Sequence, residues 1–183
     1  MNKEYTIHIE QDTDPQNPRI ECDQLGTMVC FHKRYGLGDK DTGYRAEDFS
    51  SWDELEDAIS KEHDPAVLLP IYLYDHSGIT INTSGFSCPW DSGRLGLIFA
   101  AKRKICDEFG WKRLTKKRLE RVETYLRNEV ETYDQFLTGD VWGFVIKDEQ
   151  GEDVESCWGF YGRECCEKEA QDVLKSLMSD YQP

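Results

Sequence analysis

The sequence predicts an α+β protein, a single domain built on a mostly antiparallel sheet of about six to seven strands with three main helices. Strand-like runs follow one another across Gly, Pro and Asn turns instead of alternating with helices, which favours antiparallel pairing. Amphipathic segments lie at the ends of these groups of strands. At 183 residues and 21.3 kDa, the chain fits one compact domain, 1–183.

The first third of the chain predicts two strands and one helix. Residues 5–10 alternate apolar and polar side chains, as a half-buried strand does, and the run TMVCFH at 27–32 is a second β-rich segment. Ser51 and Glu54 form a capping-box pattern, in which each side chain can accept the other residue's backbone N–H. We therefore expect a helix over 51–62.

The central sheet region, 67–101, is the longest apolar stretch and contains few charged residues. It divides into three predicted strands separated by Gly- and Ser-rich turns: 67–75, 79–83 and 95–101. The first two strands are expected to form a hairpin. Pro70 cannot donate to a sheet ladder, so it predicts an edge position or a bulge.

Two long helices and a second hairpin are predicted for the rest of the chain. Apolar residues recur every three or four positions from Thr115 onward, as a core-facing helix requires, and Gly139 marks the end of that helix. Two β-branched and aromatic runs flank the polar turn at 147–152, which predicts a hairpin. The last helix is expected over Arg163–Tyr181, so hairpin and helix together occupy 139–181.

The formal charge of −14 and the pI of about 4.7 argue against direct nucleic-acid binding over a broad surface, because phosphate contacts need a positive face. One basic segment, 102–121, nevertheless carries 9 basic and 3 acidic residues. We expect it to dock against an acidic surface of the same chain or of a second subunit in a homo-oligomer; a phosphate contact is the alternative. The basic residues concerned are Lys102, Arg103, Lys104, Lys112, Arg113, Lys116, Lys117 and Arg118.

The sequence predicts a cytoplasmic protein without membrane contact. Its first residues lack the layout of an export signal, and no apolar run reaches the roughly 18 residues of a membrane helix. The seven cysteines include no C-x-x-C pair and are expected to be reduced thiols. Four of the tryptophans are expected in the core: Trp90, Trp111, Trp142 and Trp158.

Six residues could carry thiol chemistry: Cys30, His32, Asp75, His76, Cys88 and Asp91. A thiol nucleophile needs a base within hydrogen-bond reach and an acid that orients the base. Cys88, in a glycine-bounded loop, or Cys30 would be the nucleophile. His76 or His32 would be the base, and Asp75 or Asp91 would orient it. A cysteine-dependent hydrolase or transferase is therefore the alternative hypothesis.

The cysteines and histidines of this set are also zinc-ligand types. Cys30, His32, His76 and Cys88 nevertheless lack the paired spacing that is typical of zinc sites. We expect no metal and no cofactor.

The main hypothesis is a protein that works by binding another protein rather than by catalysis. Carboxylates on its surface can steer and fit a basic partner, and carboxylates arrayed like phosphates can occupy a DNA-binding groove, as a DNA-mimic inhibitor does. The first predicted helix and the second predicted hairpin supply the candidates: Asp53, Glu54, Glu56, Asp57, Asp148, Glu149, Glu152, Asp153 and Glu155.

Four segments resemble a family of small acidic proteins encoded by bacteriophages and mobile elements. They are LGTMVCFHKRYGLGDK, YLYDHSGITINTSGFSCPWDSGRLG, EVETYDQFLTGDVWGF and SCWGFYG, which together span roughly residues 24–162. The resemblance brings no catalytic or binding residues with it. It implies an early or accessory phage protein that acts in a bacterial host, and interference with host defence is among the roles it suggests.

Overall fold

The computed structural model describes residues 4–179 and confirms the α+β class. Seven strands form two antiparallel sheets within this range, and no described helix is long and apolar enough to cross a membrane. The chain divides into two compact units. Residues 18–134 form the larger unit, whereas the chain up to Asn17 and the chain from Gln135 onward form the smaller unit. Tyr181, expected in the last helix, lies outside the described residues.

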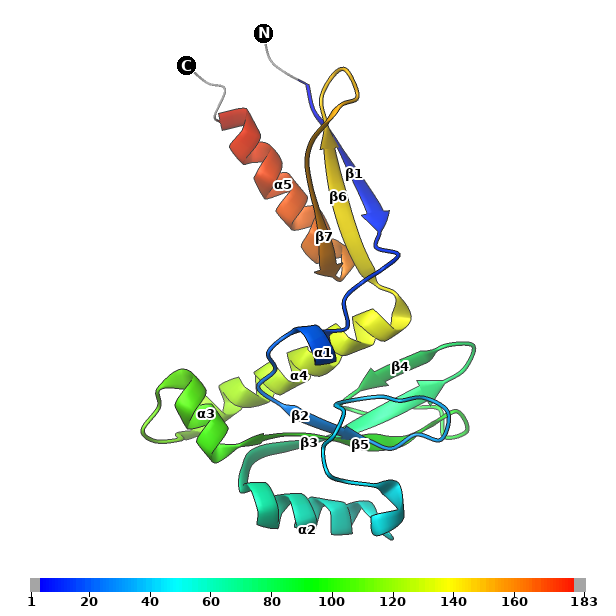
Figure 1. Ribbon diagram of the computed structural model, residues 1–183, viewed down its shortest axis with the longest axis vertical. Helices are drawn as coiled ribbons and strands as arrows, with labels where there is room; N and C mark the ends of the chain where they lie inside the picture. Colours follow the sequence, from blue (N-terminus) through cyan, green and yellow to red (C-terminus); the bar gives the residue numbers. More distant parts are fainter. Residues whose placement is uncertain (1–3, 180–183) are drawn as a thin grey trace. The chain divides into compact units, whose positions relative to one another are not determined.

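The larger unit is a four-stranded sheet between helices, in strand order β2-β5-β3-β4 (Figure 1). The strands are β2 (Thr27–Cys30), β3 (Pro65–Asp75), β4 (Ile79–Asn82) and β5 (Ser92–Ala101). The helices are α1 (Pro18–Glu21), the 3-10 helix η1 (Ala46–Asp48), α2 (Trp52–His63), α3 (Lys102–Phe109) and α4 (Lys116–Thr138), the last of which continues past the division.

Helix α2 begins as its capping pattern predicts, with one difference. The backbone N–H of Glu54 donates to the Ser51 hydroxyl over 3.3 Å, so Ser51 is the N-cap. The Glu54 carboxylate accepts from Ser50 instead of Ser51, over 2.8 Å. Both contacts satisfy backbone N–H groups that have no partner within a helix, which explains why the helix begins here.

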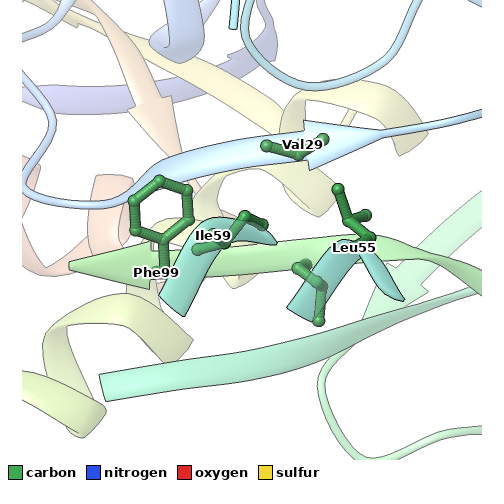
Figure 2. Close-up of a cluster of buried hydrophobic side chains, with 5 residues drawn as sticks. Val29, Leu55, Ile59 and Phe99 are labelled. Carbon is green, nitrogen blue, oxygen red and sulfur yellow. The ribbon is translucent and has the colours of Figure 1, made fainter. Parts of the chain in front are cut away.

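Helices α2 and α4 bury apolar side chains on opposite faces of the sheet. Leu55 and Ile59 of α2 pack against Val29 and Phe99 of β2 and β5, and all four are 2% exposed or less (Figure 2). The apolar stripe predicted for α4 is confirmed, because its central members are almost fully buried: Val122, Leu126, Val130 and Tyr133.

A buried ion pair joins the elements of the larger unit. The Arg19 side chain is 1% exposed, and its guanidinium binds the carboxylate of Asp39 over 2.7 Å and that of Glu129 over 3.0 Å. Asp39 also accepts from the backbone N–H of Met28, and Glu129 accepts from that of Leu25, both over 2.8 Å. The charge removed from water is thus compensated by two carboxylates that themselves bind the backbone.

The smaller unit is a three-stranded sheet with one helix on its face (Figure 1). Its elements are β1 (Thr6–Gln11), β6 (Val141–Lys147), β7 (Asp153–Tyr161) and α5 (Arg163–Ser179), with β6 in the centre. Phe144 and Ile146 of β6 pack against Cys166 and Ala170 of α5, all nearly inaccessible to water. The predicted hairpin therefore exists as β6 and β7.

Two features of the sheets were not visible in the sequence. The strands divide between two sheets, because β1 pairs with β6 rather than with the strands of the larger unit. Strand β3 lies between β5 and β4, but β4 pairs only with Tyr72–Asp75, so Pro70 has a strand on one side only and the edge position applies locally. The register shifts between Ile71 and Tyr72, next to that proline, which agrees with the bulge alternative.

The buried ion pair predicts a large loss of stability when Arg19 is removed. Arg19→Met leaves two half-buried carboxylates without their cation, so the free energy of unfolding should fall by about 3–5 kcal/mol in urea titrations. Arg127→Met is the matched control, since Arg127 forms an exposed pair with Glu123 on α4; its loss should stay below about 0.5 kcal/mol. Equal losses for the two variants would contradict a stabilising role of the buried pair.

Candidate functional site

Polar residues gather where β3 ends and β5 begins, around Asp91. The Asp91 carboxylate lies 3.3 Å from Nδ1 of His76, and its backbone carbonyl accepts from Asp75 over 2.8 Å. The Asp75 carboxylate binds the Arg34 guanidinium. The two strands therefore bring together three of the residues expected to carry chemistry, with the His76 imidazole beside the Asp91 carboxylate and the Asp75 carboxylate paired with Arg34.

Cys88 joins this cluster through Asp91 and not through a histidine. Its thiol lies 3.9 Å from the Asp91 carboxylate, and its carbonyl accepts from the Ser92 hydroxyl. Within the described residues, neither His76 nor His32 hydrogen-bonds to the Cys88 sulfur. The thiol and the imidazole share one carboxylate, whereas a thiol nucleophile requires the imidazole beside the sulfur.

Cys30 lies elsewhere, against the buried ion pair. The residue is half-buried, but its sulfur lies against Gly38, where an added Cβ would be only 3.1 Å from it. Burial raises the pKa of the Cys30 thiol to about 12; the Arg19 charge lowers this pKa and the Asp39 charge raises it. The thiol therefore stays protonated at neutral pH, and a protonated thiol is a poor nucleophile.

His32 faces a different environment from Cys30, although strand alternation predicts a shared side. Strand β2 ends at Cys30, and beyond it Nδ1 of His32 accepts from the backbone N–H groups of Arg34 and Tyr35. The imidazole stacks on the Tyr35 ring with centroids 4.9 Å apart. Local contacts with the backbone and with Tyr35 therefore hold the His32 imidazole, and within the described residues it forms no hydrogen bond with the Cys30 thiol.

Three of the residues expected to carry chemistry line one shallow hollow of about 400 Å³: His32, Asp75 and Asp91. Trp90 also lines it and is 91% exposed, so its expected place in the core is wrong. The described residues contain no group of three or more His, Cys, Asp and Glu side chains arranged to hold a metal ion.

The acidic candidates of the β6–β7 hairpin divide into two kinds. Asp148 organises the turn by accepting from the backbone N–H groups of Gln150 and Glu152, and Asp153 binds Lys147 over 2.6 Å. Glu149 accepts from the backbone of Glu4. The Glu152 and Glu155 side chains are exposed and form no ion pair within the part of the chain described.

Strand β7 also presents exposed apolar side chains. All residues from Asp153 to Gly159 are exposed, including Val154 at 40% and Trp158 at 46%. The Trp158 ring lies on Gly143, where an added Cβ would come within 2.2 Å of it. Trp158 was expected in the core, and this exposure corrects that expectation.

The acidic candidates of α2 are also divided. Glu56 binds the Arg94 guanidinium, which itself lies 5.4 Å above the Trp52 ring. Glu54 caps the helix, as described above. Asp53 and Asp57 are exposed and form no ion pair among the described residues.

Most of the basic segment makes no ion pair outside itself. Among the described residues, only Lys102 pairs with a carboxylate beyond the segment, Asp64, over 2.6 Å. Arg118 and Arg121 instead lie over the Trp111 ring, 4.8 and 5.9 Å from its centroid. Contacts of the segment with other parts of the described chain thus include the Lys102 ion pair and a hydrogen bond from Lys104 to the Gln24 carbonyl over 2.6 Å, and docking on a second subunit remains a prediction.

Comparisons with protein-family models, with curated proteins and with solved structures found no match to this chain.

Thiol labelling tests the cysteine-enzyme alternative. We expect iodoacetamide to label the exposed Cys22, Cys157 and Cys165 in the native protein, and Cys30 only after unfolding, because labelling needs the thiolate. His76→Ala should leave the Cys88 rate unchanged, because the imidazole contacts Asp91 instead of the sulfur. Rapid Cys88 labelling well below pH 8 that His76→Ala slows would support the enzyme hypothesis instead.

Charge reversal at the start of α4 tests whether the basic segment docks. Its first turn contains Lys116 and Lys117 and no acidic residue, which opposes the helix dipole. Without docking, Lys117→Glu should raise the free energy of unfolding by about 0.3–1 kcal/mol in urea titrations. Lys112→Glu, in the preceding loop, is the control with the same charge change. Loss of stability or of a dimer in Lys117→Glu would show docking.

Proposed function

We propose that this chain is a non-catalytic binding protein that recognises a basic surface of another protein. Strand β7 carries the proposal, because exposed Trp158 and Val154 stand there among carboxylates. In the context that the resemblance implies, the partner is a host or phage protein in the bacterial cytoplasm. An accessory role of this kind, including interference with host defence, needs affinity and no chemistry.

Protection of the sheet edge is a simpler explanation for β7, but it accounts only for the charges and bulges of this strand. Edge strands avoid unwanted pairing through charges and bulges, and β7 has Asp153, Glu155 and two register shifts. Protection of an edge does not require exposed Val154 and Trp158. Tryptophan is enriched among the residues that contribute most to protein interfaces. An interaction surface therefore accounts for the charged residues of β7 and for its exposed apolar side chains.

The charge of the smaller unit defines the kind of partner. It holds 15 acidic and 5 basic residues, whereas the larger unit holds 21 and 17. A net charge of −10 on 66 residues favours association with a basic protein. DNA mimicry is a more specific version of this proposal, in which the carboxylates of Glu149, Glu152 and Glu155 take the place of DNA phosphates.

Capture from a bacterial lysate at two salt concentrations tests the proposal. A partner should be retained at about 0.05 M salt and released at about 0.5 M, because salt screens exposed charges. Trp158→Ala should weaken binding by about 2 kcal/mol, the size of an interface hot spot. Glu152→Lys with Glu155→Lys should abolish retention.

The matched control is Glu164→Lys with Glu169→Lys, which makes the same charge change on exposed positions of α5. Retention equal in both double variants would contradict binding through β7, and no retained protein at either salt concentration would contradict the proposal as a whole. Release of the partner by duplex DNA would support mimicry, and indifference to DNA would restrict the proposal to protein recognition.

A further inference from the structure

A hollow of about 280 Å³ at the start of α2 has a mixed lining, in which Ser50 and Ser51 lie beside apolar and aromatic side chains. Phe31, Phe49 and Trp52 form its aromatic wall, and Ala46 and Leu55 add aliphatic surface. Its volume is slightly below the roughly 300–1,000 Å³ of small-molecule pockets. It therefore suits one large side chain of a partner.

The aromatic wall is formed before any partner binds. The Phe31 ring is stacked with the Phe49 ring at 6.5 Å and with the Trp52 ring at 6.0 Å, and the planes differ by only 17° and 16°. All three rings pack against the buried cluster that contains Val29 and Leu55, which Figure 2 shows. A rigid apolar surface loses little conformational entropy on binding, which favours affinity.

Exposed carboxylates alternate along the chain with the residues that line the hollow. They are Glu47, Asp48, Asp53 and Glu54, and none forms an ion pair within the described residues. The backbone N–H of Ser50 lowers the pKa of Glu54, so this carboxylate is ionised at neutral pH. The nearest basic neighbour in sequence, Arg45, lines an adjacent hollow instead.

We propose that this α2 hollow binds a partner segment in which one aromatic or large apolar side chain is flanked by Lys or Arg residues. The apolar wall takes the central side chain, and the rim of carboxylates selects the flanking cations. This inference rests on the proposed function, because it assigns a second contact for the same basic partner. It also gives a role to Asp53 and Glu54 that differs from simple surface charge.

A labelled peptide tests the α2 hollow with purified protein. The probe is a five-residue peptide with tryptophan between two arginines on each side, and fluorescence anisotropy measures its affinity. Replacing its tryptophan by alanine, or its arginines by glutamates, should weaken binding about tenfold or more. On the protein, Asp48→Lys with Asp53→Lys should have a similar effect, and Ala46→Trp, which fills the hollow, should abolish binding.

Two controls separate this inference from nonspecific attraction and from the proposed function. Glu164→Lys with Glu169→Lys changes the net charge equally on α5 and should leave the peptide affinity within about twofold. Glu152→Lys with Glu155→Lys should do the same, although it abolishes partner capture through β7. If Ala46→Trp fails to fold, the affinities of the unchanged protein for the original peptide and its alanine and glutamate versions still test the inference.

Failure of the inference and failure of the proposed function give different results. No binding of the arginine–tryptophan peptide, or equal binding of all three peptides, would overturn the α2 hollow even if lysate proteins are retained through β7. If the peptide binds and Asp48→Lys with Asp53→Lys removes this binding, the α2 hollow is supported as a binding site even if no lysate protein is captured. Equal losses of peptide affinity in Asp48→Lys with Asp53→Lys and in the α5 control would also overturn the inference.

Discussion

The buried guanidinium of Arg19 is the constraint on which the larger unit depends. A charge removed from water is stable only when ion pairs and hydrogen bonds satisfy it. Asp39 and Glu129 do so, and through Met28 and Leu25 they also fix the backbone around the start of β2. The chain after Asp39 leads directly into η1 and α2, so the same pair anchors one end of the segment that builds the aromatic hollow.

Local sequence patterns predicted the elements well, because local contacts decide them. The stripe on α4 is buried where the helical period places it, and Gly139 follows the helix with a positive φ of 75°. Ser51 caps α2 as expected. The hairpin of β6 and β7 forms around its polar turn, which Asp148 organises through two backbone contacts. Each of these features involves residues close together in the sequence.

Features that depend on distant residues were not predictable in the same way. Arg19 and Glu129 are 110 positions apart, and no local pattern indicates that an arginine of the short helix α1 pairs with a glutamate of α4. Strand β1 was predicted, but its pairing with β6 joins Thr6 to Lys147. Composition also misled for the tryptophans, because Trp90 and Trp158 are exposed. Trp90 lies between turn residues, where no periodicity indicates whether a side chain is buried, and Trp158 lies on the edge strand β7, whose place in the sheet depends on pairing with β6.

Acidic residues of one type perform different roles here, and net charge alone does not separate them. Asp148 holds a turn and Glu56 binds Arg94, so these carboxylates have partners within the chain. Glu152 and Asp53 are exposed and form no ion pair among the described residues. Carboxylates of the second kind stand beside exposed apolar groups, on β7 and at the α2 hollow. An interface needs that combination, because apolar contact supplies affinity while charge selects the partner.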